Sequence, residues 1–185
     1  MAQPLAERLR PTSFEGYVGQ QHLVGEGAVL RRMIDSGRIL SFILWGPPGT
    51  GKTTIAKIIA HKLNRPFYTL NAVSSGVKEV REVIDKAKNS PLFSNGGAIL
   101  FIDEIHRFNK SQQDSLLSAV ETGTVTLIGA TTENPSFEVI RPLLSRCQLY
   151  VLKSLEKEDL ITLLNHAITT DEVLLKRGVE PRVPP

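Results

Sequence analysis

The chain has 185 residues and a formal net charge of +3, which is enough length for one domain with a proper core and the beginning of a second. Its single cysteine, Cys147, excludes an intramolecular disulfide, and no run approaches the roughly 18 apolar residues that cross a bilayer. The N-terminus lacks the apolar core of a signal peptide, so we expect a cytoplasmic protein without a membrane partner. A charge balance this mildly basic permits nucleic-acid binding without indicating it.

Residues 1–26 are predicted to form an irregular lead-in, because Arg10-Pro11 and Gly16 disfavour a long continuous helix. Apolar residues at helical spacing then predict a helix from Gly27 to Ser36. The next segment, Phe42 to Trp45, is a continuous apolar run of the kind that forms a buried parallel strand.

A phosphate-loop pattern, G-x-x-x-x-G-K-[ST], lies between this strand and a helix predicted from Thr53 to Leu63. The residues of the loop are Gly46, Pro47, Pro48, Gly49, Thr50, Gly51, Lys52 and Thr53, with Thr54 behind them. Glycines in such a loop let backbone N–H groups close around phosphate oxygens at the N-terminus of the helix. A plain Gly/Pro-rich turn would leave Lys52 and Thr53 unexplained, so we predict nucleotide binding.

Strands and helices alternate along the rest of the chain, which predicts a parallel sheet with helices on both faces. The predicted elements are strand Pro66–Leu70, helix Gly76–Lys88, strand Ala98–Ile102 after a Gly-rich loop at residues 94–97, helix Ser111–Glu121, strand Val125–Gly129, a short helix after the polar turn Thr131–Pro135, strand Gln148–Leu152, the amphipathic helix Glu156–Thr169 with apolar Leu160, Ile161, Leu163, Leu164 and Ala167, and a polar, Pro-rich tail from Arg177.

Asp103 and Glu104 follow the most continuous apolar strand after the first, which is the Walker B pattern. The strand would deliver both carboxylates to the carboxyl edge of the sheet, where open α/β sheets bind ligands. We expect Asp103 to hold Mg²⁺ together with Thr53, and Glu104 to accept a proton from the attacking water. A solvated turn is the alternative, but the position about 50 residues after a phosphate loop favours the functional interpretation.

Hydrolysis of a nucleotide also needs positive charge against the transferring phosphoryl group. Arg146 is the candidate, because it lies between a short helix and the fifth strand, from where it could reach the γ-phosphate of a different subunit. The alternative is an ordinary surface arginine.

These motifs, together with the runs 75–81, 106–114 and 129–137, resemble the AAA+ ATPases of the clamp-loader group, and more narrowly the replication-associated recombination protein A family (RarA, also called MgsA). The resemblance implies a P-loop NTPase fold with sheet order 5-1-4-3-2. It implies an AAA+ domain at residues 1–152 and the start of a helical lid at 153–185. The chain lacks the sensor 2 motif of the family, so we expect a truncated ATPase core with weak activity and weak assembly.

The resemblance also implies roles for single residues. Thr132 aligns with sensor 1, which orients the lytic water, and the sequence leaves Asn134 open as an alternative. Arg146 aligns with the arginine finger that acts in trans, and Asn71 with a residue that restrains Glu104. The residues that align with the adenine pocket are Arg10, Pro11, Tyr17 and Val18.

DNA is implied as a partner by the family, with Lys78 and Arg81 as candidates for phosphate contacts and Arg107 and Lys110 as fainter ones. A solvated helix face with internal charge pairs would also explain Lys78 and Arg81. The predicted function is an ATPase, using ATP and Mg²⁺, that acts on DNA at stalled or damaged replication forks as a homo-oligomer, with proteins such as single-strand binding protein among its partners. The alternatives are a clamp-loader subunit or Holliday-junction motor, and a nucleotide-binding assembly scaffold with little hydrolysis.

Overall fold

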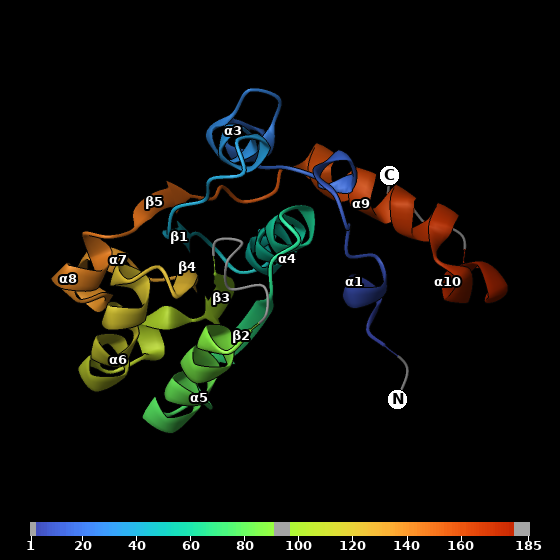
Figure 1. The fold of residues 1–185 in the computed structure, drawn as a ribbon. Coiled ribbons are helices and arrows are strands. Elements are labelled where there is room, and N and C mark those ends of the chain that lie inside the picture. The colour runs from blue at the N-terminus through green and yellow to red at the C-terminus, as the bar shows by residue number, and fades with distance from the viewer. Residues whose placement is uncertain (1–2, 91–96, 180–185) are drawn as a thin grey trace.

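A five-stranded parallel sheet forms the centre of the fold (Figure 1). The computed structural model describes residues 3–90 and 97–179. Its strands are β1 (Phe42–Trp45), β2 (Phe67–Asn71), β3 (Ala98–Asp103), β4 (Val125–Thr131) and β5 (Gln148–Val151). Their spatial order is β2-β3-β4-β1-β5, with every pairing parallel, which confirms the predicted order 5-1-4-3-2 counted from the other edge. Most of the predicted Gly-rich loop and the end of the predicted tail lie outside the described residues.

Helices connect the strands, and the helices expected from the sequence are present with ends shifted by one or two residues. They are α1 (Leu5–Arg8), η1 (Phe14–Gly16), α2 (Gln21–Val24), α3 (Val29–Asp35), α4 (Lys52–Lys62), α5 (Val77–Lys88), η3 (Ile105–Arg107), α6 (Lys110–Glu121), α7 (Pro135–Glu138), α8 (Arg141–Leu144), α9 (Lys157–Thr170) and α10 (Glu172–Lys176). The lead-in is less irregular than expected, because it contains α1, η1 and α2. None of these exceeds four residues, as the breaks at Pro11 and Gly16 imply.

The sheet separates two apolar layers, because successive strand side chains point to opposite faces. On β1, Phe42 and Leu44 pack with the lead-in, α3 and α4, whereas Ile43 packs with α5 and α6. All three side chains are fully buried. Burial on both faces is why the strand is apolar at every position and was recognisable from sequence.

The segment that follows β4 is fixed to α6 by one buried amide. Gln113 is 2% exposed, and its Nε2 donates to the carbonyl oxygens of Phe108 at 3.0 Å and Glu138 at 2.9 Å. Its Oε1 accepts from the Ile140 N–H at 2.8 Å. One side chain therefore pairs three backbone groups where η3, α6 and the α7–α8 turn meet.

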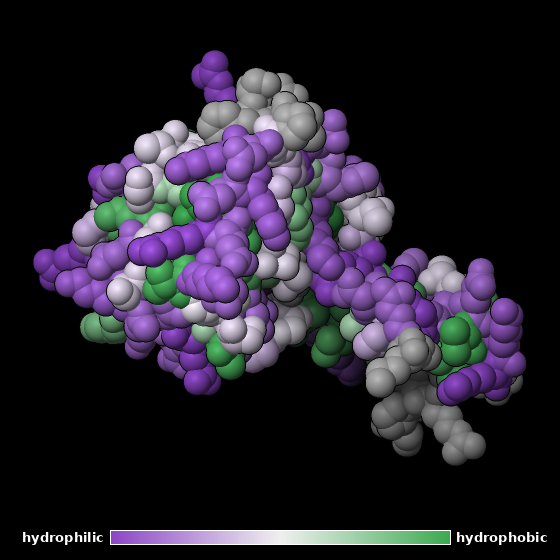
Figure 2. Space-filling model, turned by 60° about the horizontal axis from the view of Figure 1, so that its bottom comes forward, coloured by the Kyte–Doolittle hydropathy of each residue, from purple (hydrophilic) through white to green (hydrophobic). Residues whose placement is uncertain are grey.

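Helices α9 and α10 lie beyond α4, away from the sheet, and form a smaller lobe beside the main body (Figures 1 and 2). A capping box starts α9, in which Asp159 Oδ2 accepts from the Glu156 N–H at 3.0 Å. The predicted apolar face of α9 exists, but the described residues bury only Ala167. The exposed fractions of four apolar side chains of α9, Leu160, Ile161, Leu163 and Leu164, lie between 37% and 62%. The apolar spacing therefore predicted the helix correctly, but its apolar face is exposed where that of a core helix would be covered.

Candidate active site

The phosphate loop runs from the end of β1 to the first turn of α4. Its glycines at 49 and 51 have φ of +74° and +92°, which side-chain-bearing residues rarely adopt. Gly51 precedes α4, so the free N–H groups of the helix begin directly behind the loop. A Cβ on Gly51 would overlap the Tyr17 hydroxyl oxygen and lie 2.9 Å from Tyr17 Cζ. The loop is therefore shaped both by its own backbone and by the lead-in packed behind it.

Lys52 is held against the backbone of the same loop. Its Nζ donates to the carbonyl oxygens of Gly46 and Pro47, both at 2.7 Å, and the residue is 9% exposed. Burial lowers the pKa of the Lys52 ammonium, and the charge of Asp103 acts in the opposite direction. A partly desolvated cation interacts more strongly with an anion than one in water does. The loop thus carries its own positive charge beside the helix N-terminus.

A cavity of about 380 Å³ opens beside the loop at the carboxyl edge of the sheet. Its lining residues are Ala6, Arg10, Pro48, Gly49, Thr50, Gly51, Lys52, Thr53, Thr54, Asp103, Glu104, Thr131 and Thr132. The cavity therefore brings together predicted residues from the phosphate loop, from the end of β3 and from the end of β4. Gly46 and Pro47 take part through the carbonyl groups that accept from Lys52.

Asp103 and Glu104 reach this cavity because the chain turns sharply at the end of β3. Glu104 has φ 52° and ψ 45°, a left-handed conformation that is uncommon for a residue with a side chain. Its N–H donates to Asp103 Oδ1 at 3.0 Å, which fixes the first carboxylate while the backbone turns the second away from the strand. Strain of this kind is concentrated at functional sites.

The turn after β4 distinguishes the two sensor 1 candidates by position. Thr132 lines the cavity. Asn134 instead accepts from the Ser136 N–H at 3.0 Å and caps α7, whose first residue is Pro135. Turn chemistry therefore accounts for Asn134, whereas Thr132 remains available to a ligand.

The neighbouring Thr131 is buried and supports this turn. Its Oγ1 accepts from the Glu133 N–H at 3.0 Å and lies 3.0 Å from His106 Nδ1. Sequence reasoning missed His106, which links η3 after Glu104 to the end of β4. Its position close behind Asp103 and Glu104 in the sequence was the available signal.

The lead-in residues take different positions from one another. Arg10 lines the cavity, and its Nη1 donates to Thr54 Oγ1 at 2.8 Å. The Tyr17 hydroxyl donates to the Thr50 carbonyl at 3.0 Å, and burial raises its pKa. Pro11 lines a separate cavity of about 560 Å³ between the lead-in and α9–α10, to which Arg10 also contributes, while Val18 and Tyr17 line neither cavity.

Arg146 lies away from the cavity of its own chain. It precedes β5, and Gln148 of β5 pairs in register with Phe42 at the start of β1. The phosphate loop follows the other end of β1, about 13 Å away for a four-residue strand. The Arg146 guanidinium pairs with Glu121 and donates to the Pro142 carbonyl at 2.7 Å. Arg146 therefore lies at the amino ends of the strands, and the cavity lies at their carboxyl ends.

The DNA candidates and Asn71 also lie outside the cavity. Lys78 and Arg81 are exposed on α5, and Lys78 Nζ is 3.9 Å from Glu82 Oε1 on the next turn. Arg107 and Lys110 are exposed as well. Asn71 Oδ1 accepts from the Val73 N–H at 2.8 Å, so a local turn uses this side chain although Asn71 pairs in register with Asp103.

Known proteins that match this chain include AAA ATPases and replication-associated proteins. Residues 42–155 match the model of the ATPase family associated with various cellular activities (AAA). The chain is 56% identical to replication-associated recombination protein A of Haemophilus influenzae over 89% of this chain and 37% of that protein. It is 49% identical to ATPase WRNIP1 of Dictyostelium discoideum over 94% of this chain and 20% of that protein. The chain thus spans well under half the length of these relatives.

Among solved structures, the Holliday junction branch migration motor RuvB of Thermotoga maritima is similar, with a TM-score of 0.71 and 30% identity over 87% of this chain and 54% of that one. These relatives confirm the resemblance to the replication-associated recombination protein A family that the motifs indicated. No helix among the described residues is both long and apolar enough to span a membrane.

Proposed function

The chain belongs to the AAA family of ATPases, and from this membership and the geometry of its cavity we propose that it is the ATP-hydrolysing core of a DNA-dependent ATPase acting at stalled or damaged replication forks. The observation that carries the proposal is the cavity that gathers Lys52, Thr53, Asp103, Glu104 and Thr132. The printed name of the H. influenzae relative supports the link to replication and recombination.

The donor set of the cavity suits Mg²⁺. Thr53 and Asp103 both line it and offer one hydroxyl and one carboxylate oxygen. Mg²⁺ usually takes one or two carboxylates and completes its shell with water and substrate phosphates, so it needs no larger protein cluster. When bound, the ion would offset the charge of the nucleotide phosphates.

The residues of the cavity divide the work of hydrolysis. Backbone N–H groups of the loop and the first turn of α4 receive the phosphates, and Lys52 exchanges its carbonyl partners for phosphate oxygens. Glu104 accepts the proton of the water that attacks the γ-phosphate, and Thr132 orients that water. Arg146 of a neighbouring copy supplies the remaining positive charge, since the Arg146 of the same chain lies at the other edge of the sheet.

We propose that α5 contacts DNA, because Lys78 and Arg81 are exposed on it and their length lets them reach phosphates. Lys78 lies at the outer limit of an ion pair with Glu82, and an exposed pair of this kind contributes little to stability. A partner phosphate could therefore displace it at small cost. Alanine at both positions should reduce the stimulation of ATP turnover by forked DNA and leave turnover without DNA unchanged.

The decisive experiment replaces Glu104 by Gln. Glu104→Gln should still bind ATP but hydrolyse it at least about a hundredfold more slowly, since it loses general-base catalysis. Glu138→Gln is the matched control, because Glu138 is exposed on α7 and lies outside the cavity. Unchanged turnover in Glu104→Gln would refute the proposed chemistry.

A second candidate function is a branch-migration motor, which the similarity to RuvB favours. The two functions predict different DNA preferences with the same chemistry. Stimulation of turnover by four-way junctions well above that by forked DNA would support the motor, and the reverse order would support action at forks.

A further inference from the structure

The short helix α1 lies between the phosphate-loop helix α4 and the lobe formed by α9 and α10 (Figure 1). It spans only Leu5–Arg8, has no side-chain cap and contains no buried residue. A helix of one turn is unstable by itself, because the entropy lost in forming the first turn is not offset by the hydrogen bonds of further turns. The charged side chains of α1 and of the residues beside it are therefore what fixes its place.

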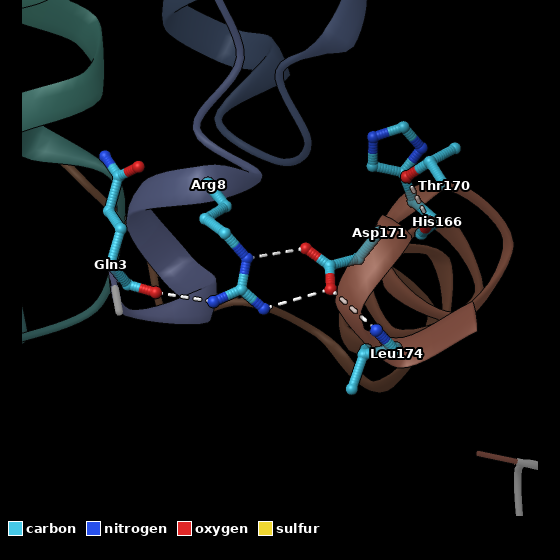
Figure 3. A network of polar contacts seen from close by, with 6 residues as sticks. All are labelled: Gln3, Arg8, His166, Thr170, Asp171 and Leu174. Atoms are coloured by element: carbon cyan, nitrogen blue, oxygen red, sulfur yellow. Dashed lines mark hydrogen bonds and ion pairs between the residues drawn. The ribbon is translucent and has the colours of Figure 1, made fainter. Parts of the chain in front are cut away.

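On the side of the lobe, α1 is held by one bidentate ion pair (Figure 3). Arg8 Nε donates to Asp171 Oδ2 at 2.8 Å, and Arg8 Nη2 donates to Asp171 Oδ1 at 2.9 Å. Asp171 is 5% exposed and stands between α9 and α10, where its Oδ1 also accepts from the Leu174 N–H at 3.0 Å. A bidentate pair with a buried carboxylate fixes orientation as well as distance.

On the side of α4, α1 is held by a chain of contacts that ends at the nucleotide cavity. Glu7 Oε1 is 3.0 Å from Lys57 Nζ, and Glu7 Oε2 accepts from Arg10 Nε at 2.9 Å. Arg10 Nη1 in turn donates to Thr54 Oγ1 at 2.8 Å, in the wall of the cavity. Glu7 and Arg8 are adjacent residues, so a shift of one moves the other.

We propose that Asp171 is a positioning residue for the nucleotide site, which holds α1 through Arg8 and thereby keeps the Arg10 guanidinium at Thr54 beside the bound phosphates. The proposal rests on the proposed ATP binding. It makes the affinity for ATP depend on a carboxylate of the lobe that does not line the cavity at the phosphate loop, but lines the neighbouring cavity of about 560 Å³ together with Arg10 and Pro11. The lobe and the cavity are thus coupled through one helical turn.

The segment that leads into α9 is held to the main body by separate hydrogen bonds, so loss of the ion pair between Arg8 and Asp171 should not detach the lobe. Gln20 Nε2 donates to the Lys153 carbonyl at 2.6 Å, and Gln20 Oε1 accepts from the Lys153 N–H at 3.0 Å. Asparagine at position 171 can still accept from the Leu174 N–H as an N-cap. Asp171→Asn therefore removes the charge that holds Arg8 while it keeps the cap and the hydrogen bonds between Gln20 and Lys153.

The test measures ATP affinity in the presence of Mg²⁺ by titration of the chain and its variants. Asp171→Asn should weaken binding about tenfold, within the usual range of coupling between two sites. Asp35→Asn is the matched control, because it makes the same change in a carboxylate with exposed pairs to Lys62 and Arg31, and its affinity should equal that of the unmodified chain. Melting curves establish that each variant is folded. If Asp171→Asn does not fold, Arg8→Lys takes its place, since lysine keeps the charge but loses the bidentate contact.

A double-mutant cycle separates positioning from general destabilisation. In an Arg10→Met background, Asp171→Asn should have no further effect, because the group through which it acts is already gone. Full additivity of the two changes, or an unchanged affinity in folded Asp171→Asn, would overturn the inference. A chain that fails to bind ATP before any substitution would instead refute the proposed function itself.

Discussion

Gly51→Ala is expected to destabilise the chain far more than alanine at an ordinary left-handed glycine. Two penalties add at this position. A side chain at φ +92° costs about 1–2 kcal/mol. The new Cβ also overlaps the Tyr17 hydroxyl, and overpacking in a filled site costs typically about 1–3 kcal/mol. Tyr17 cannot yield easily, because it is buried, packs edge-on against Phe14 and donates to the Thr50 carbonyl.

The matched control is Gly123→Ala, at φ +71° with no atom within 4 Å of the added Cβ, so it carries only the conformational cost. Urea unfolding of both variants should give a loss of about 3 kcal/mol for Gly51→Ala and about 1 kcal/mol for Gly123→Ala. Adding Tyr17→Phe to Gly51→Ala should recover part of the difference, since the hydroxyl overlap disappears while the ring carbon stays close. Equal losses in the two single variants would refute the argument.

Three further predictions concern stability and reactivity. Gln113→Leu should cost about 3 kcal/mol in urea unfolding, because it removes the partner of one buried and two partly buried backbone groups, and a loss within error of zero would contradict this. The pKa values of Glu7 and Asp171 are lowered to about 2, mainly by hydrogen bonds from Arg10 and Arg8. Their stabilisation is therefore complete above about pH 4.5 and is lost as the pH falls toward 2. Unfolding followed from pH 5 to pH 2 should show a shallower loss in the Glu7→Gln/Asp171→Asn variant. Burial raises the pKa of Cys147 to about 12, so alkylation at pH 8 should be orders of magnitude slower than for a free thiol until the chain is unfolded.

The parts of the fold that could be predicted are those in which sequence-local patterns carry the information. β1 and residues 98–102 of β3 are buried on both faces and therefore uniformly apolar, so the sequence pattern indicated both strands. The phosphate loop combines glycines needed for left-handed backbone with a lysine and a threonine, so its residues could be placed in advance. The strand order came from the resemblance to a known family, because no local pattern encodes which strands pair.

The parts that could not be predicted depend on contacts between distant segments. Arg8 and Asp171 are 163 positions apart, and nothing near either residue indicates the other. The assignment of Arg10 to the adenine pocket by resemblance stays a prediction, and no pattern near Arg10 indicates its contact with Thr54, 44 positions away. The apolar period of α9 correctly predicted a helix but could not tell whether Leu164 would be covered.

The separation of Arg146 from the cavity of its own chain has a consequence for any assembly that uses both. A copy that gives its arginine through one surface and receives one through a different surface associates head to tail, so the contact is heterologous and either closes into a ring or continues as an open row. In a ring every cavity is completed, whereas an open row always leaves one terminal cavity without an arginine. The rate of ATP turnover per chain would then rise with the number of copies in an open row and reach its maximum when the row closes into a ring. Enzyme kinetics alone could therefore distinguish an open row from a closed ring.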